Sequence, residues 1–306
     1  MTSKPRSCRQ CSRPRWRRGL AAAVLASSPR FEALWHHTRC PPTSLLWIQD
    51  LAKHTSTRIP IPGAVLDCIW SNDGERITYS FFGDDAPAIW ERRGDGAGES
   101  VKLYSISGAR SYAGPKNWSP DGKLLAFVQF DMADRRTTMR LLEQGASSFE
   151  STARTHLVSN SAVDWLSFSP DGRWVNFLSD ESGRDELYVQ RFSGPGAWAE
   201  DAKSGRVQVS TSGASLPVWW SRDGKEIRYV DADAQVVSVA VETTQSFSAA
   251  LPKPLYSIKG LKAQGRTFTP EGRLMVVLEN EGGAITKIDL VVNFLDEMRA
   301  RLAAGQ

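Results

Sequence analysis

The cysteines and histidines near the N-terminus are the first residues whose types and spacing could do chemistry. Cys8 and Cys11 form a Cys-x-x-Cys pair, and His36, His37 and Cys40 follow. Thiolates and imidazoles in such an order can close a tetrahedral zinc site. The pair is single, however, the gap to the histidines is long, and arginines and prolines crowd it. We therefore expect neither a metal site nor a cofactor in this chain.

Nucleophilic catalysis and phosphate binding also lack their usual residues. A serine hydrolase of the α/β class presents its nucleophile in a Gly-x-Ser-x-Gly turn, and residues 145–149 (Gly-Ala-Ser-Ser-Phe) lack the second glycine. The glycine-rich residues 94–98 are followed by no helix whose N-terminus could bind an anion. His54 and His156 have no evident Ser or Cys partner, so we interpret both as surface residues. We expect no catalytic residue.

Two acidic pairs could contribute oxygen ligands to a calcium ion. They are Asp231 with Asp233, and Asp180 with Glu181. Each pair lacks the remaining oxygen ligands of a recognisable calcium site. Cys68 precedes a strand-like aromatic residue and is expected to pack as a small apolar side chain.

An acidic residue followed by glycine recurs five times along the chain. The copies are Asp73-Gly74, Asp121-Gly122, Asp171-Gly172, Asp223-Gly224 and Glu271-Gly272. Successive acidic positions lie 48, 50, 52 and 48 residues apart. An aromatic residue and Ser or Thr come before each pair, and a charged and an apolar residue come after it. Since aspartate bonds back to the backbone and glycine takes a positive φ, we assign these ten residues a structural role in tight turns.

The segments around these turns have the composition of short β-strands. Each turn is followed by an apolar strand, and further strands complete each period without a long helix. The expected second strands are 77–82, 124–130, 174–178, 227–230 and 274–278. Four strands per period of nearly constant length predict an all-β fold, a β-propeller of five to six four-stranded blades. A two-sheet sandwich would explain the strands but not the period. Most of the eleven tryptophans fall on strand positions, which favours packing between blades.

The ends of the body leave two ways to close the ring. Residues 45–51 and 57–61 read as the last two strands of a blade whose first half is absent. They either complete the last blade, which gives five blades, or form a sixth, partial blade. The absent half is what a gene fragment or a misread start would produce. We place the propeller at residues 43–292.

Residues 1–42 differ from the body in charge. Nine basic residues and one acid give residues 1–40 a charge of +8, which leaves −4 for residues 41–306. Three interpretations are open, namely a targeting signal with the apolar run 19–26, the zinc site above, and a disordered extension, which we favour. The body has no basic stripe, so nucleic acid is not expected as a partner. No apolar run reaches the ~18 residues that cross a bilayer, so no integral membrane segment is expected.

Residues 293–306 are predicted to form a short C-terminal helix. Asn293 suits an N-cap, and acids precede arginines along the segment. Phe294, Leu295, Met298 and Leu302 share one face. A helix lying on the side of the propeller is the preferred interpretation, and a helix that docks a partner is the alternative.

The repeat resembles the WD-like repeat of TolB-type propellers over residues 45–295. The stretch from Phe168 to Pro217 is especially similar, with its Phe-Ser-Pro-Asp-Gly-Arg-Trp turn and the strand Leu187–Phe192. It is similar to the C-terminal propeller of bacterial serine/threonine protein kinases, although the kinase signatures themselves are missing here. Asn72 and Arg222 stand where Pro is usual, and Glu271 replaces Asp.

The resemblance implies a module that binds proteins or peptides and is not itself catalytic. It also implies a periplasmic or other extracytoplasmic place, with the cytoplasm as the open alternative, and we expect a monomer. The alternative function is the propeller part of a peptidase or hydrolase, or an enzyme acting at the mouth of the channel. Such an enzyme would need titratable groups that converge in one cavity.

Overall fold

The computed structural model describes most of the body of the chain as strands and turns. The described residues are 25–27, 31–36, 45–50, 55–61, 64–82, 88–105, 111–131, 136–144, 154–159, 163–194, 205–261, 263–269 and 271–278. Their strands form six antiparallel sheets, which we number as blades 1 to 6 in chain order. The part of the chain described in this way contains no helix.

Blades 1 to 3 each have four described strands. Blade 1 contains β1 (Leu25–Ser27), β2 (Phe31–His36), β3 (Leu45–Asp50) and β4 (Thr55–Ile59). Blade 2 contains β5 (Ala64–Trp70), β6 (Arg76–Phe82), β7 (Ala88–Arg93) and β8 (Val101–Ser105). Blade 3 contains β9 (Ser111–Trp118), β10 (Leu124–Asp131), β11 (Arg136–Glu143) and β12 (Arg154–Ser159).

Blades 4 to 6 vary in their outer strands. Blade 4 contains β13 (Val163–Phe168), β14 (Trp174–Ser179), β15 (Glu186–Arg191) and β16 (Val207–Gln208). Blade 5 contains β17 (Ser215–Trp220), β18 (Glu226–Val230), β19 (Gln235–Glu242), β20 (Ser248–Ala249) and β21 (Lys253–Ser257), and both β20 and β21 pair with β19. The described strands of blade 6 are β22 (Ala263–Phe268) and β23 (Leu274–Leu278).

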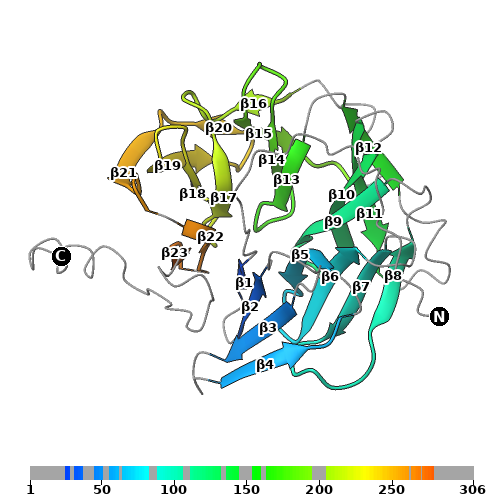
Figure 1. Ribbon diagram of the computed structural model, residues 1–306. Helices are drawn as coiled ribbons and strands as arrows, with labels where there is room; N and C mark the ends of the chain where they lie inside the picture. The colour runs from blue at the N-terminus through cyan, green and yellow to red at the C-terminus, as the bar shows by residue number, and fades with distance from the viewer. Residues whose placement is uncertain are drawn as a thin grey trace, which may run out of the picture.

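The first strands of the blades lie side by side around one axis. β1 contacts β5 and β22, β9 contacts β5 and β13, and β17 contacts β22. Figure 1 shows the sheets following one another in chain order around a ring, with blade 6 beside blade 1. Twisted antiparallel sheets in this radial arrangement form a β-propeller, as the period of the turns predicted.

The five acid-glycine turns lie at one end of this ring. Each one joins the first strand of a blade to its second strand, from β5–β6 in blade 2 to β22–β23 in blade 6. Because neighbouring first strands run in the same sense around the axis, these turns gather on one side, which we call the turn face. The loops between the second and third strands lie on the opposite face.

The hydrophobic core consists of the interfaces between neighbouring blades. Five clusters of buried side chains each span two adjacent sheets, from blades 1 and 2 to blades 5 and 6. Trp174 of blade 4, for example, lies in one cluster with Val218 and Trp220 of blade 5. Full burial of one large apolar side chain stabilises the fold by about 1.5–3 kcal/mol. Stacked sheets therefore depend on their neighbours for stability, as the tryptophan positions indicated.

Every first strand of blades 2 to 6 has a register shift against its second strand. In β5 the shift lies between Val65 and Asp67, and in β9 Lys116 is the extra residue. Equivalent shifts occur in β13, β17 and β22. An extra residue of this kind bends the strand and re-aims its side chains. At these positions the side chains of the innermost strands no longer alternate regularly between the two faces of the sheet.

Blade 1 corrects the expectation of an absent half-blade. The structure places β1 and β2 before β3 and pairs all four strands, so blade 1 is a separate sheet and the ring has six sheets rather than five. Both strands fall within residues 1–42, the segment expected to be a disordered extension. The sequence here reads Ser28-Pro29-Arg30-Phe31, which is the turn motif without its Asp-Gly, so the repeat was not recognised.

Several expected features fall outside the described residues. The apolar run 19–26 lies there except for Leu25 and Ala26. The expected helix 293–306 also lies there. The division into residues 1–42, 43–292 and 293–306 stays a prediction.

Candidate functional site

Four of the five turns on the turn face are built from a serine, an aspartate and a glycine, and the fifth has Thr269, Glu271 and Gly272. In blade 3, Ser119 Oγ donates to Asp121 Oδ1 at 2.6 Å and accepts from Leu124 N at 2.9 Å. Lys123 N donates to Asp121 Oδ1 at 3.2 Å. Gly122 N donates to Ser119 O at 2.8 Å, and Gly122 has a φ of +71°, which L-residues rarely adopt. The residue types of the repeat thus follow from the geometry of one turn.

The same contacts recur in the other turns. The hydroxyls of Ser71, Ser169 and Ser221 donate to Asp73, Asp171 and Asp223 at 2.5–2.6 Å. Gly74, Gly172, Gly224 and Gly272 have φ values between +69° and +76°. In the fifth turn Thr269 Oγ1 accepts from Arg273 N at 3.3 Å, and Glu271 is exposed to solvent. The structure therefore places all ten predicted turn residues on one face.

The hydrogen bonds keep the turn aspartates ionised. The bond from the serine hydroxyl is the largest effect that lowers the pKa of Asp73, Asp121 and Asp223, and backbone N–H groups add to it. For Asp171 the largest single effect is burial, which acts in the opposite sense. Bonds from Ser169 and Arg173 outweigh it and lower the pKa of Asp171. A carboxylate held in this way is a fixed acceptor and a poor general acid near neutral pH.

Side chains connect successive turns around the ring. Asn72 Nδ2 of blade 2 donates to Ser119 O of blade 3 at 2.6 Å. Arg173 of blade 4 donates to Thr243 O and Thr244 O of blade 5 at 2.9 and 3.0 Å. Arg228 of blade 5 donates to Gly272 O of blade 6 at 2.6 Å.

Arg228 fixes its link to blade 6 by two further contacts. Its guanidinium lies over the ring of Trp219, 5.0 Å from the centroid. It also pairs with Glu226, with Nε 2.7 Å from Oε1. The pairing holds the planar guanidinium in one orientation, so the bond to Gly272 is preset.

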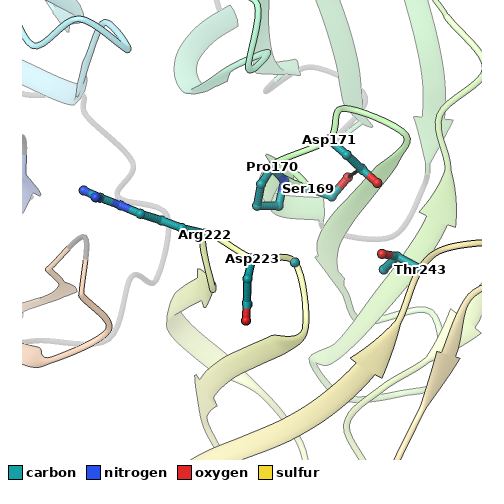
Figure 2. A pocket seen from close by; sticks show the side chains of 7 residues that line it. Ser169, Pro170, Asp171, Arg222, Asp223 and Thr243 are labelled. Atoms are coloured by element: carbon teal, nitrogen blue, oxygen red, sulfur yellow. Dashed lines mark hydrogen bonds between the residues drawn. The ribbon is translucent and has the colours of Figure 1, made fainter.

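A small hollow lies between the turns of blades 4 and 5. Its volume is about 200 Å³. It is lined by Ser169, Pro170, Asp171, Arg222, Asp223, Gly224 and Thr243. Figure 2 shows Asp171, Asp223 and Thr243 around it, while the Arg222 side chain extends away. Pockets for drug-sized ligands typically measure about 300–1,000 Å³, so this hollow fits a single side chain rather than a whole substrate.

An ion pair lies between the innermost strands of blades 2 and 3. Lys116 Nζ of β9 is 2.7 Å from Asp67 Oδ2 of β5. The Lys116 side chain is 9% exposed and the Asp67 side chain 24% exposed. A Cβ at Gly114 would lie 2.3 Å from Asp67 Oδ2, so glycine leaves the room that the carboxylate needs. This pair was not predicted from the sequence, although Asp67 is the one charged residue of β5 and Lys116 the one charged residue of β9, which was a visible signal.

The acidic pairs considered for calcium serve other purposes. Asp231 Oδ1 accepts from Asp233 N and Gln235 N at 3.0 and 2.8 Å and so closes a turn. Glu181 pairs with Arg206, with Oε2 2.6 Å from Nη1. Within the described ranges, no group of three or more His, Cys, Asp or Glu side chains could hold a metal ion. Cys8, Cys11, His37 and Cys40 lie outside those ranges, as does the side chain of His36.

The remaining candidates have ordinary positions. Cys68 is buried between blades 1 and 2, and burial raises the pKa of its thiol, so it is unreactive. Residues 94–98 form the loop between β7 and β8. His54, the side chain of His156 and residues 145–149 lie outside the described part. No helix of the part that the structure describes has the length and apolar character needed to cross a bilayer.

Comparison with known proteins identifies the fold independently. The sequence model of the TolB beta propeller domain matches residues 60–306. Among solved structures, a putative TolB from Agrobacterium tumefaciens is similar, with 17% identity and a TM-score of 0.57 over 84% of this chain and 88% of that chain. We found no match among curated proteins.

Two further structures show the range of proteins that contain this fold. TolB from Acinetobacter baumannii has 17% identity and a TM-score of 0.59, over 82% of this chain and 59% of that chain. A puromycin hydrolase has 15% identity and a TM-score of 0.59, over 90% of this chain and 47% of that chain. The chain therefore spans about half of the hydrolase. At these identities the similarity establishes the shared fold alone.

Proposed function

The chain belongs to the TolB beta propeller domain family, and from that premise we propose that it is a non-catalytic module that binds a protein or peptide. The role would be that of a sensor or scaffold in a bacterial envelope or receptor-kinase system. The partner would be a folded protein or an extended peptide, and the chain would act as a monomer outside the cytoplasm.

The state of the turn carboxylates is the observation that supports this function best. Four of the five acids of the turn face accept hydrogen bonds from their own serine, and these four have lowered pKa values. A hydrolase or lyase would instead need at least one acid or base with a pKa near neutrality in a cavity that holds the substrate. A rigid face of fixed acceptors and short loops is better suited to binding than to proton transfer.

The bond network of the turn face supports binding in a second way. Asn72, Arg173 and Arg228 each donate a hydrogen bond to a backbone carbonyl of the next blade, so the polar groups are held at fixed spacings. Binding surfaces on rigid scaffolds lose little conformational freedom when a partner docks. The extracytoplasmic place is inferred from membership of the TolB family and is part of the proposal.

A site-specific photocrosslinking experiment tests the proposal and finds the face that is used. A photoreactive residue replaces Lys123 on the turn face, whose side chain is 79% exposed. Matched controls carry it at Ser182 on the opposite face and at Leu251 on the outer edge, which is 88% exposed. Peptides selected from a random library on the purified chain serve as the probe. Crosslinking at one face and not at Leu251 supports a binding module, and failure to select any peptide contradicts it.

The alternative function is an enzyme, either the propeller part of a peptidase or hydrolase or an enzyme at the channel mouth. The same preparation is incubated with a panel of esters and peptides. If the chain turns over one of these substrates, and Asp171→Asn abolishes the turnover while the fold is retained, the chain is an enzyme and the binding proposal is wrong.

A further inference from the structure

Arg266 is a half-buried cation on the innermost strand of blade 6. It lies on β22 opposite Val276 of β23. Val276 and Phe268 pack in one cluster with Val230 and Val236 of blade 5, so this side of the blade 6 sheet faces blade 5. The side chain of Arg266 forms no hydrogen bond or ion pair with any residue that the structure describes, and burial alone lowers the pKa of its guanidinium. A cation in such a place is costly unless something pairs with it.

A second blade interface shows what pairs with a cation at this position. Lys116 stands three residues before Ser119, as Arg266 stands three residues before Thr269. Both precede the turn of their blade, and Lys116 is paired with Asp67 on the first strand of the preceding blade. The residue of blade 5 that corresponds to Asp67 is Pro217, which has no charge. The described first strands of blades 5 and 6 thus provide the cation but no carboxylate.

Arg222 provides another cation near the same interface. It is exposed in the turn that follows β17, the strand that contacts β22. Figure 2 shows its side chain extended away from Asp171 and Thr243, toward the side of the view that holds the orange ribbon of blade 6. Strand residues advance about 3.3 Å each, so Arg266 lies roughly 10 Å below the turn face on which Arg222 lies. An extended chain that enters from the turn face would pass Arg222 before it reaches Arg266.

The charges around the mouth restrict the kind of anion that fits. The turn aspartates Asp73, Asp121, Asp171 and Asp223, whose pKa values are lowered, lie on the turn face, and residues 41–306 have a net charge of −4. These charges repel a nucleic acid or another polyanion. One carboxylate can still form a two-point contact with a guanidinium, which is the geometry that arginine favours. A small free acid would gain too few other contacts, whereas a peptide gains them along the inner strands.

We propose that Arg266, with Arg222 at the entrance, binds an Asp or Glu side chain of an extended acidic peptide at the inner edge of blades 5 and 6. The peptide carboxylate takes the place that Asp67 occupies beside Lys116. This inference rests on the proposed binding function and names the chemistry of the partner.

The test starts from a random library of short peptides with blocked ends, selected for binding to the full chain. Each Asp or Glu of a selected peptide is then changed to Asn or Gln. We expect the selected peptides to share one Asp or Glu, and its change to Asn or Gln to weaken binding by about 10- to 100-fold, because one charged pair contributes on that order. The variant Arg266→Gln should lose the same factor, and the selected peptides should no longer discriminate Glu from Gln. Arg266→Lys should retain part of it.

Matched variants separate a binding role from a structural one. Arg191→Gln removes an exposed arginine from the third strand of blade 4 and should leave binding unchanged. Arg266→Gln should unfold in urea at the same or a higher concentration than the parent chain, because it removes an unpaired half-buried charge. If that variant fails to fold, the affinity of the selected peptides for Arg222→Gln is measured instead. Since Arg222 is exposed, we expect a smaller loss of affinity, of about threefold to tenfold.

Each other outcome has a definite meaning. Peptides that bind without a preference for acids, or that bind Arg266→Gln as well as the parent, overturn this inference and leave the binding function standing. If no peptide binds the chain in any selection, the proposed function fails and this inference fails with it.

Discussion

Gly114 lies beside the Asp67–Lys116 ion pair, so a substitution there tests how much this pair stabilises the fold. A Cβ added at Gly114 would lie 2.3 Å from Asp67 Oδ2 and 3.2 Å from its Cγ. The carboxylate must therefore rotate away from Lys116, whose side chain is 9% exposed, and the 2.7 Å contact between them is lost. We expect Gly114→Ala to lower the free energy of unfolding through the loss of this pair rather than through backbone strain.

The magnitude follows from the exposure of the two partners. Removing one member of a fully buried pair costs about 3–5 kcal/mol. The Asp67 side chain is 24% exposed, so water screens part of the charge and we expect a cost of about 2 kcal/mol. For a chain of 306 residues that cost corresponds to a fall in Tm of about 3 °C. Urea unfolding followed by tryptophan fluorescence measures it, since the chain has 11 tryptophans.

A double-mutant cycle isolates the pair from other effects of the methyl group. In an Asp67→Ala background the carboxylate is gone, and the remaining Cβ contact of 3.3 Å is tolerable. Gly114→Ala should then cost close to nothing. An equal cost in both backgrounds would refute the reasoning, because the damage would then come from the backbone or from a different neighbour.

Two further predictions concern the turn face. Gly122→Ala should cost about 1 kcal/mol in urea unfolding, because Gly122 has a φ of +71° and open space around it, so the strain is in the backbone alone; Gly122→Asn should recover part of the loss, and an equal cost for Asn would contradict this cause. The turn aspartates should make the fold acid-sensitive. Their folded pKa values lie below the ordinary 3.8, so their stabilisation is present above that pH and is lost as the pH falls through the lowered values. Replacing Asp73 and Asp121 by Asn should flatten the loss of Tm below about pH 4, and an unchanged slope would show that other carboxylates dominate.

The sequence predicted the blades well where the turn chemistry was complete. Aspartate and glycine at fixed spacing determine a local turn, and a local turn determines the hairpin of two strands, as Ser119 to Leu124 illustrates. Blade 1 escaped recognition because Ser28-Pro29 is followed directly by Arg30, without the Asp-Gly that marks the other turns. The signal that failed was a local motif, whereas the strands themselves depend on pairing, β1 with β2 and β2 with β3.

Contacts between blades could not be predicted in the same way. Arg173 meets Thr243 and Thr244 across about seventy residues, and Lys116 meets Asp67 from another sheet. Such contacts depend on the bulges of the first strands and on how far each sheet is rotated about the axis. Residue types suggested which side chains were available, and only the assembled ring decided which of them met.

The bonds that join Asn72, Arg173 and Arg228 to the next blade have a thermodynamic consequence. Because these bonds already restrict the motion of the blades, the propeller loses little conformational entropy on binding. The entropy lost when a complex forms should therefore come mainly from the bound peptide. Peptides that are made rigid in the bound conformation, by cyclisation or by proline, should bind more tightly because they lose less conformational entropy. The propeller would then select peptides by their shape without changing its own conformation.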